Sequence, residues 1–288
     1  MTSPGSDRSC RSDVVAGSVT QRLVTAGDVD LAVTDRGAGE PVVFIQTALT
    51  ADELVPLAEQ PALHDGYRRI VYHRPGYGRS GPARGPASIP REAAQCRALL
   101  GALGVARAHI VGVSFSAAIG LQLAADAPDL VHSLTVAEPP PVHIPGADGF
   151  RAANERLLEL RRERGVDAAL EEFLTMLVGV DWRAEVDGRL PGAVEQIERD
   201  AASFFDRDVP ALLDWGFGPA AAARITCPVL NLGGSDSGPW FVDVRALVAG
   251  WIPHAETEVI EGAGHSLEVT HPAEVAAALV GFLHRHPL

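Results

Sequence analysis

Apolar and polar positions follow two different periods along this chain. Short runs that are apolar at almost every position are typical of strands covered on both faces, whereas apolar residues at three- and four-residue spacing predict helices. Two alternating runs around Ala26-Gly27-Asp28 predict an antiparallel hairpin over residues 21–25 and 29–34. Expected strands are 42–46, 69–72, 109–113, 133–137, 229–232 and 256–260, and expected helices are 89–103, 115–125, 240–250 and 272–285. This alternation predicts an α/β fold with a doubly wound, mostly parallel sheet.

The alternation stops in the middle of the chain. Residues 150–223 show mainly helical periodicity and many charges, with no strong strand signal. Candidate helices there are 150–164, 167–178, 192–205 and 209–215. We therefore predict a helical cap over residues 140–223, inserted into a core of residues 21–139 and 224–288 and preceded by a loose tail of residues 1–20. Near the start of the core, Thr50-Ala-Asp-Glu53 predicts a capping box that opens a helix.

One turn of the predicted core carries candidate chemistry. Residues 109–124 read as an apolar strand, a turn of small residues with Ser114 at its apex, and an apolar helix. This pattern is the G-x-S-x-G nucleophile elbow with Ser116 in place of the last glycine. Such a strained turn exposes the Ser114 hydroxyl, and it directs the first backbone N–H groups of the helix at the group that the hydroxyl attacks. A serine hydroxyl needs a neighbouring base. His265, in a Gly-Ala-Gly-His loop, is the candidate base, and Asp236 is the candidate acid that orients its ring.

Five motifs in order resemble those of the α/β-hydrolases over roughly residues 21–286. They are Pro41–Ile45, Tyr72–Ser80, Gly112–Ser116, Cys227–Asp236 and Gly262–Pro272. The resemblance implies the α/β-hydrolase fold with a helical cap and a Ser114, Asp236, His265 triad. Some members of that family place the acid after the strand that follows the elbow strand, so Glu138 is the reserve candidate.

The resemblance also implies an oxyanion hole made of two backbone N–H groups, those of Phe115 and Ala48. Where relatives usually carry His-Gly, this chain has Gln46-Thr47. Threonine is β-branched and resists the positive φ that glycine tolerates, so this half of the hole is either a tolerated variant or is adapted to an unusual substrate. The Gln46 side chain also has an N–H₂ group that could bind a substrate oxygen.

Apolar residues of the predicted cap should make the pocket apolar and of medium to large size. Most of them are expected to pack cap helices together. Trp215 and Phe217, together with Gln46 and Thr47, are the candidate substrate-binding residues.

Composition excludes several classes of partner. The net charge is −13, so nucleic acid and anionic membranes are not expected partners. All 24 basic residues are arginine, which excludes a lysine nucleophile. The three cysteines have no disulfide or metal spacing, and no metal or other cofactor is expected. No signal-peptide or membrane-spanning pattern is found, which predicts a cytoplasmic protein, either a monomer or a homodimer.

The leading hypothesis is a serine hydrolase that cleaves a carboxylic ester, lactone or thioester of a small to medium apolar substrate through an acyl-enzyme. Two alternatives stay open. The same Ser-His pair could catalyse acyl transfer or cyclisation of a natural-product intermediate, or the fold could be a non-catalytic protein that binds a small ligand.

Overall fold

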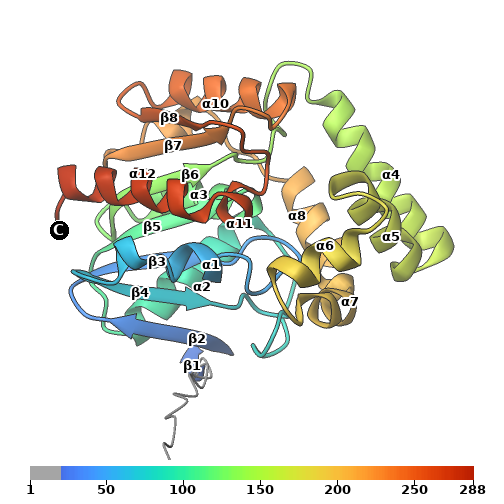
Figure 1. Ribbon diagram of the computed structural model, residues 1–288, viewed down its shortest axis with the longest axis horizontal. Helices are drawn as coiled ribbons and strands as arrows, with labels where there is room; N and C mark the ends of the chain where they lie inside the picture. The colour runs from blue at the N-terminus through green and yellow to red at the C-terminus, as the bar shows by residue number, and fades with distance from the viewer. Residues whose placement is uncertain (1–20) are drawn as a thin grey trace, which may run out of the picture.

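A mixed eight-stranded sheet forms the centre of the protein (Figure 1). The computed structural model describes residues 21–288, and the predicted tail of residues 1–20 lies outside this range. The strands are β1 (Arg22–Ala26), β2 (Val29–Gly37), β3 (Glu40–Ile45), β4 (Tyr67–Tyr72), β5 (Ala108–Val113), β6 (Val131–Ala137), β7 (Val229–Gly234) and β8 (Glu256–Ile260). Their spatial order is β1-β2-β4-β3-β5-β6-β7-β8. The β1–β2 and β2–β4 pairs are antiparallel and all the others are parallel. The predicted fold class is therefore confirmed.

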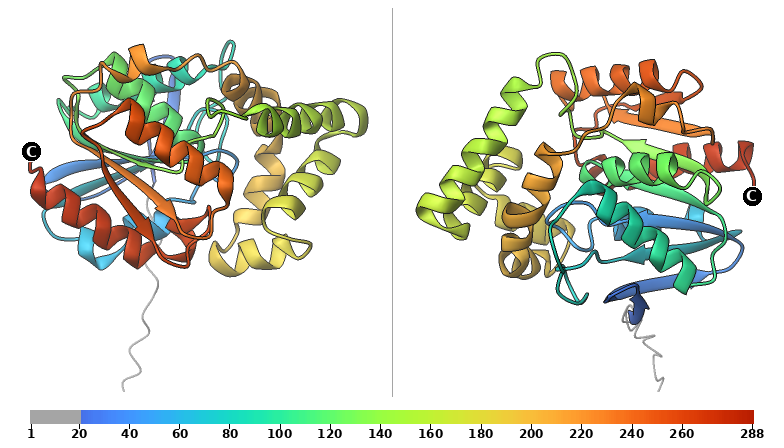
Figure 2. Two further views of the ribbon diagram at one scale, coloured as in Figure 1. Left: turned by 90° about the horizontal axis from the view of Figure 1, so that it is seen from above. Right: turned by 180° about the vertical axis from the view of Figure 1, so that it is seen from behind.

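Helices cover both faces of this sheet (Figures 1 and 2). They are α1 (Val55–Ala58), the 3₁₀ turn η1 (Pro61–Leu63), α2 (Ile89–Ala102), α3 (Phe115–Asp126), α9 (Pro219–Ala222), α10 (Pro239–Trp251), α11 (Leu267–Thr270) and α12 (Pro272–Arg285). Side chains alternate along each strand, so Val43 and Ile45 of β3 pack with α2 and α3, whereas Val42 and Phe44 pack with α1 and α12. Burial on both faces explains why the central strands are apolar at nearly every position.

The helices between β6 and α9 form a separate layer beyond one end of the sheet (Figure 1). They are α4 (Asp148–Arg164), α5 (Val166–Leu177), α6 (Trp182–Arg189), α7 (Ala193–Ser203), the π-helical turn η2 (Phe204–Asp208) and α8 (Val209–Leu213), and we call them the cap helices. Trp182 and Phe205 are fully buried in an apolar cluster that the cap helices share. The layer therefore has its own small core.

The cap helices end earlier than the periodicity predicted. Trp215 and Phe217 are buried in the cluster that covers the α3 face of the sheet, and the Trp215 indole N–H donates to Gln122 Oε1 of α3 at 3.0 Å. Residues 214–223 thus belong to the core rather than to the cap helices. Aromatic residues pack equally well in either place, so their spacing alone does not define the boundary.

The expected capping box at Thr50–Glu53 is wrong. Helix α1 begins only at Val55, and its N-cap residue, Leu54, makes no side-chain cap. The Ala51 N–H donates instead to Gln196 Oε1 of α7 at 2.8 Å. A tertiary contact thus replaces the local cap, and Glu53 faces a cavity described below.

Within residues 21–288, no helix is both long and apolar enough to cross a bilayer. The same part of the chain has no group of three or more His, Cys, Asp or Glu residues placed to hold a metal ion.

Candidate active site

The turn between β5 and α3 holds Ser114 in a strained conformation. Its φ is +50° and its ψ is −121°, which are unusual for a residue with a side chain. The chain closes tightly here, since a Cβ on Gly112 would lie 2.4 Å from the Ser116 carbonyl oxygen. The Ser116 hydroxyl accepts from the Val113 N–H and donates to the Val113 carbonyl, both at 2.9 Å. Ser116, which replaces the usual glycine, therefore stabilises the turn through its own side chain.

Three side chains from separate segments form a continuous proton relay. The Ser114 hydroxyl lies 3.1 Å from Nε2 of His265, and His265 Nδ1 lies 2.7 Å from Glu138 Oε2. A carboxylate only accepts, so Nδ1 carries the proton and Nε2 is free to take one from the serine. Glu138 follows β6 directly and is fully buried, and its other oxygen accepts from the Gly234 N–H at 2.8 Å. The ring and the carboxylate are thus fixed from both sides.

The structure corrects the choice of acid, since Asp236 does not contact His265. Asp236 is exposed, and its carboxylate accepts from the neighbouring Ser235 hydroxyl at 2.8 Å. The turn after β7 is held by other bonds, since the Gly234 N–H donates to Glu138 and the Ser235 hydroxyl accepts from the Gly262 N–H. The reserve candidate, Glu138, occupies the place behind the ring.

Phe115 and Ala48, the residues predicted to supply the oxyanion hole, both have backbone N–H groups without an intrachain acceptor among residues 21–288. Phe115 is the first residue of α3, so its N–H has no partner one turn earlier in the helix. Ala48 belongs to the loop after β3, and its N–H donates to no group among residues 21–288. Both residues line the same cavity as Ser114. Thr47 is accommodated because its hydroxyl donates to the Val113 carbonyl at 2.9 Å, which ties this loop to the elbow.

Arg74 supports the loop from behind. Its guanidinium donates to the carbonyl oxygens of Gln46 at 3.1 Å and Thr47 at 3.2 Å, and it pairs with Asp208 of η2. Glu92 of α2 lies 3.4 Å away on another side. Burial opposes the charge on Arg74, but these two carboxylates raise its pKa above the ordinary value. A permanently charged side chain therefore joins the oxyanion loop to the cap helices.

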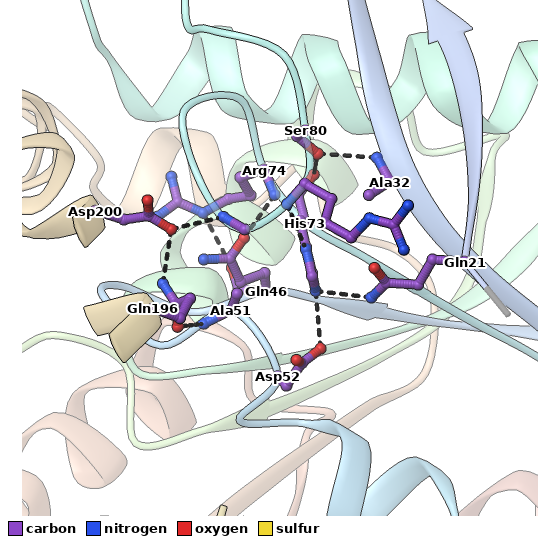
Figure 3. Close-up of polar contacts among 12 residues, drawn as sticks. Gln21, Ala32, Gln46, Ala51, Asp52, His73, Arg74, Ser80, Gln196 and Asp200 are labelled. Carbon is purple, nitrogen blue, oxygen red and sulfur yellow. Dashed lines mark hydrogen bonds and ion pairs between the residues drawn. The ribbon is translucent and has the colours of Figure 1, made fainter. Parts of the chain in front are cut away.

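Gln46 faces this support rather than the substrate. Its Oε1 accepts from the Arg74 backbone N–H at 2.6 Å (Figure 3). Gln46 does not line the cavity. The proposal that its side chain binds a substrate oxygen is therefore not supported by its position. Its Nε2 is buried without a hydrogen-bond partner within residues 21–288.

A wider polar network fastens α7 to the same loops (Figure 3). Gln196 binds the Ala51 N–H at 2.8 Å and the Leu49 carbonyl at 3.0 Å, and Asp200 accepts from the Gly78 N–H at 2.7 Å. These bonds hold the cap helices over the nucleophile.

Ser114 opens into a cavity of about 500 Å³ between the sheet and the cap helices. Most of its wall is apolar, with Phe150, Leu157, Phe173, Leu174 and Ile197 among the lining side chains. Thr47 lines it, but Trp215 and Phe217 do not; both are buried in the cluster that covers the α3 face of the sheet. Two of the four candidate substrate-binding residues from the sequence, Trp215 and Phe217, are thus placed wrongly, and a third, Gln46, faces away.

Comparison with known proteins agrees with this geometry. A model of the alpha/beta hydrolase family matches residues 41–278. The chain belongs to the alpha/beta hydrolase family. It is 28% identical over 255 residues to a putative carbamate hydrolase, RutD, of Caulobacter vibrioides. The aligned region covers 85% of this chain and 91% of that protein. It also resembles solved structures of an alpha/beta hydrolase from Sphaerobacter thermophilus (27% identity, TM-score 0.71, 91% of this chain and 100% of that one) and a thermophilic esterase from Thermogutta terrifontis (22%, 0.73, 93% and 99%).

Sequence reasoning missed three residues at the centre of this alpha/beta hydrolase site. The Phe241 ring of α10 stacks on His265 with centroids 4.0 Å apart. Glu53 and Glu268 line the cavity close to the same histidine. Only the position of Glu268, three residues after His265, was available as a signal in the sequence.

Proposed function

We propose that this alpha/beta hydrolase is a serine hydrolase that cleaves carboxylic esters, lactones or thioesters of apolar, medium-sized acyl substrates through an acyl-enzyme. The single observation that carries the proposal is the Ser114–His265–Glu138 relay at the base of an apolar cavity.

The proposed reaction follows from the positions of these groups. His265 takes the proton of Ser114 as the hydroxyl oxygen attacks the carbonyl carbon, and the Phe115 and Ala48 N–H groups stabilise the oxyanion. His265 then gives the proton to the leaving oxygen or sulfur, and the acyl group stays on Ser114. Water, deprotonated by His265, releases the acid and restores the serine. Glu138 stabilises the imidazolium that forms in each half of the cycle.

The size and polarity of the cavity support an acyl group larger than acetyl. A cavity of about 500 Å³ lies within the range of small-molecule sites. Each buried methylene contributes about 0.8 kcal/mol, which corresponds to about a fourfold gain in kcat/KM per carbon while the chain fits. We expect p-nitrophenyl butyrate and hexanoate to be better substrates than the acetate.

The test combines turnover with labelling. The wild-type enzyme should hydrolyse p-nitrophenyl hexanoate and react with a fluorophosphonate on Ser114, located by mass spectrometry, and Ser114→Ala should lose both. Ser237→Ala, a serine on the β7–α10 loop, is the control and should keep both. Labelling without hydrolysis would overturn the hydrolase proposal in favour of acyl transfer or cyclisation. Absence of both in the folded wild-type protein would favour a ligand-binding role. A neutral p-nitrophenyl carbamate, included because of the name of the RutD relative, tests whether esters are preferred.

A further inference from the structure

One polar side chain interrupts the apolar face that α4 presents to the cavity. Phe150, Ala153, Asn154 and Leu157 line the cavity from this helix, at the three- and four-residue spacing of a single helix face. Asn154 is only 8% exposed. Asparagine is rarely buried on an apolar helix face, and it is a weaker helix former than leucine. Packing and helix propensity therefore do not explain Asn154 at this position.

The helix itself holds the Asn154 amide group in one orientation. Its Nδ2 donates to the Phe150 carbonyl oxygen, one turn earlier, at 2.9 Å. A carbonyl oxygen only accepts, so the amide nitrogen faces the backbone and Oδ1 is left free to accept. In a regular helix the Phe150 carbonyl also accepts from the Asn154 backbone N–H, so the helix does not need the side chain to satisfy this carbonyl.

The Asn154 Oδ1 is an acceptor that the protein leaves unused. It makes no hydrogen bond in the described part of the chain, yet the atom is not sealed from solvent. Two hydroxyl groups of the same cavity wall donate elsewhere, that of Thr47 to the Val113 carbonyl and that of Thr270 to the Ser266 carbonyl. A polar oxygen in an apolar wall costs free energy unless a donor reaches it, so the position favours a ligand that brings one.

A neutral hydroxyl group is the donor that suits this oxygen. Asn154 supplies no counter-charge to a cationic donor, and Phe150 and Leu157 beside it on α4 are apolar. An amide N–H would bring its own carbonyl oxygen, which would need a second donor in this wall. A hydroxyl group needs only the acceptor that Asn154 offers.

We propose that Asn154 is a substrate-binding residue that accepts a hydrogen bond from a hydroxyl group on the apolar part of the substrate. The inference rests on the proposed function for the ester, lactone or thioester group, and it adds the hydroxyl group as a second element of recognition. The carbonyl group of such a substrate would reach Ser114, and its hydroxyl group would lie against α4 in the same cavity. The substrate class is therefore hydroxylated, medium-sized apolar esters, lactones or thioesters.

Ketone binding tests the residue without turnover. 2-Heptanone has the carbonyl group and the chain of a hexanoyl ester but no leaving group, and it can enter the cavity in either direction. Calorimetric titration of the wild-type protein would compare it with 4-hydroxy-2-heptanone and 7-hydroxy-2-heptanone. A hydroxyl group left unpaired in an apolar cavity weakens binding by about tenfold or more. We expect at least one hydroxyketone to bind as tightly as 2-heptanone or more tightly, and weaker binding of both would overturn the proposal.

A near-isosteric variant assigns the effect to Asn154. Asn154→Leu should raise the ratio of the hydroxyketone Kd to the 2-heptanone Kd by about tenfold, because the hydroxyl group loses its acceptor. Its melting temperature should not fall, since the Phe150 carbonyl keeps its backbone donor. Thr270→Val is the control, because it removes a cavity hydroxyl group that already donates to Ser266, and it should leave the ratio unchanged.

Two results with these variants would contradict the assignment. One is an unchanged ratio in folded Asn154→Leu, which together with a lower melting temperature would make the residue purely structural. The other is an equal rise of the ratio in Thr270→Val. Asn154→Ala, which removes the same acceptor and suits a helix, gives the same comparison if Asn154→Leu does not fold.

Hydrolysis of matched esters separates this inference from the proposed function. We expect p-nitrophenyl 3-hydroxyhexanoate or 6-hydroxyhexanoate to have a KM no higher than that of p-nitrophenyl hexanoate. Asn154→Leu should raise the KM of that hydroxyester by about tenfold and leave kcat for the hexanoate within about twofold of the wild-type value.

The possible outcomes of this assay differ for the two proposals. Hydrolysis of all three esters, with a higher KM for both hydroxyesters in the wild-type enzyme, leaves the hydrolase intact and removes the hydroxyl site. Hydroxyketone binding that depends on Asn154, without hydrolysis of any ester, supports the site and removes the hydrolase. If Asn154→Leu lowers kcat equally for all three esters and leaves their KM ratios unchanged, the residue does not recognise a hydroxyl group and the proposal is wrong.

Discussion

The identity of the acid behind His265 gives the sharpest test of the site. Glu138→Gln keeps the length of the side chain and one accepting oxygen but removes the charge. In the proposed mechanism that charge stabilises the imidazolium formed during each proton transfer, across the contact of 2.7 Å between Nδ1 and Oε2. With the charge centres about 4 Å apart and an effective dielectric constant of about 20, the interaction is worth about 4 kcal/mol.

That energy corresponds to a loss of about 10³-fold in kcat, since each 1.36 kcal/mol is about a factor of ten. The His265 side chain is 20% exposed, so solvent reduces the loss, and we expect a decrease of about 10²–10³-fold. KM should change little, because Glu138 does not line the cavity.

The assay is initial-rate hydrolysis of p-nitrophenyl hexanoate, with the melting temperature measured for each variant. Asp236→Asn is the matched control and should stay within about twofold of the wild-type kcat, since its carboxylate is exposed and contacts only Ser235. A Glu138→Gln enzyme that retains nearly full kcat, or an Asp236→Asn enzyme that loses most of it, would refute the reasoning.

Three further predictions concern the tight packing at the elbow, the buried charge of Arg74 and the buried thiols. Gly112→Ala should lower the free energy of unfolding by about 2–4 kcal/mol, because the new Cβ would lie 2.4 Å from the Ser116 carbonyl oxygen. The control is Gly101→Ala in α2, where nothing lies within 4 Å of the new Cβ, and it should raise the free energy of unfolding by about 0.5–1 kcal/mol. Urea unfolding measures both variants, and equal effects would contradict the packing argument. Arg74→Met should destabilise the protein by about 3–5 kcal/mol, because Asp208 and Glu92 would be left buried without a counter-charge. In the same assay, Arg156→Met, which removes an exposed ion pair with Glu172, should change the free energy of unfolding by less than about 0.5 kcal/mol. Burial raises the pKa of the Cys96 thiol to about 12 and that of the Cys227 thiol to about 11. Neither thiol should therefore react with iodoacetamide at about pH 8 until denaturant is added. Peptide mass spectrometry that finds either cysteine alkylated in the native protein would contradict this prediction.

Local chemistry explains why some of the site was predictable from sequence. The elbow is a strand, a turn of small residues and a helix that are contiguous in the chain, so Ser114 and the Phe115 N–H could be placed from residues 109–124 alone. His265 was found because its loop is short and glycine-rich between two regular elements. Trp215 and Phe217 were misplaced because a buried aromatic side chain has no local sign of which core it joins.

The sequence by itself determined the doubly wound fold and pointed to Ser114 and His265, which the structure brings into contact, because periodicity and turn chemistry act over a few neighbouring residues. Only the tertiary structure decided which carboxylate stands behind His265. Glu138 and Asp236 follow two neighbouring parallel strands, β6 and β7, at the same carboxyl end of the sheet. Their positions in the sequence pattern are alike, and only the directions of their side chains differ. It also decided that Gln46 faces Arg74, since this contact joins segments far apart in the chain whose approach depends on packing of the whole domain.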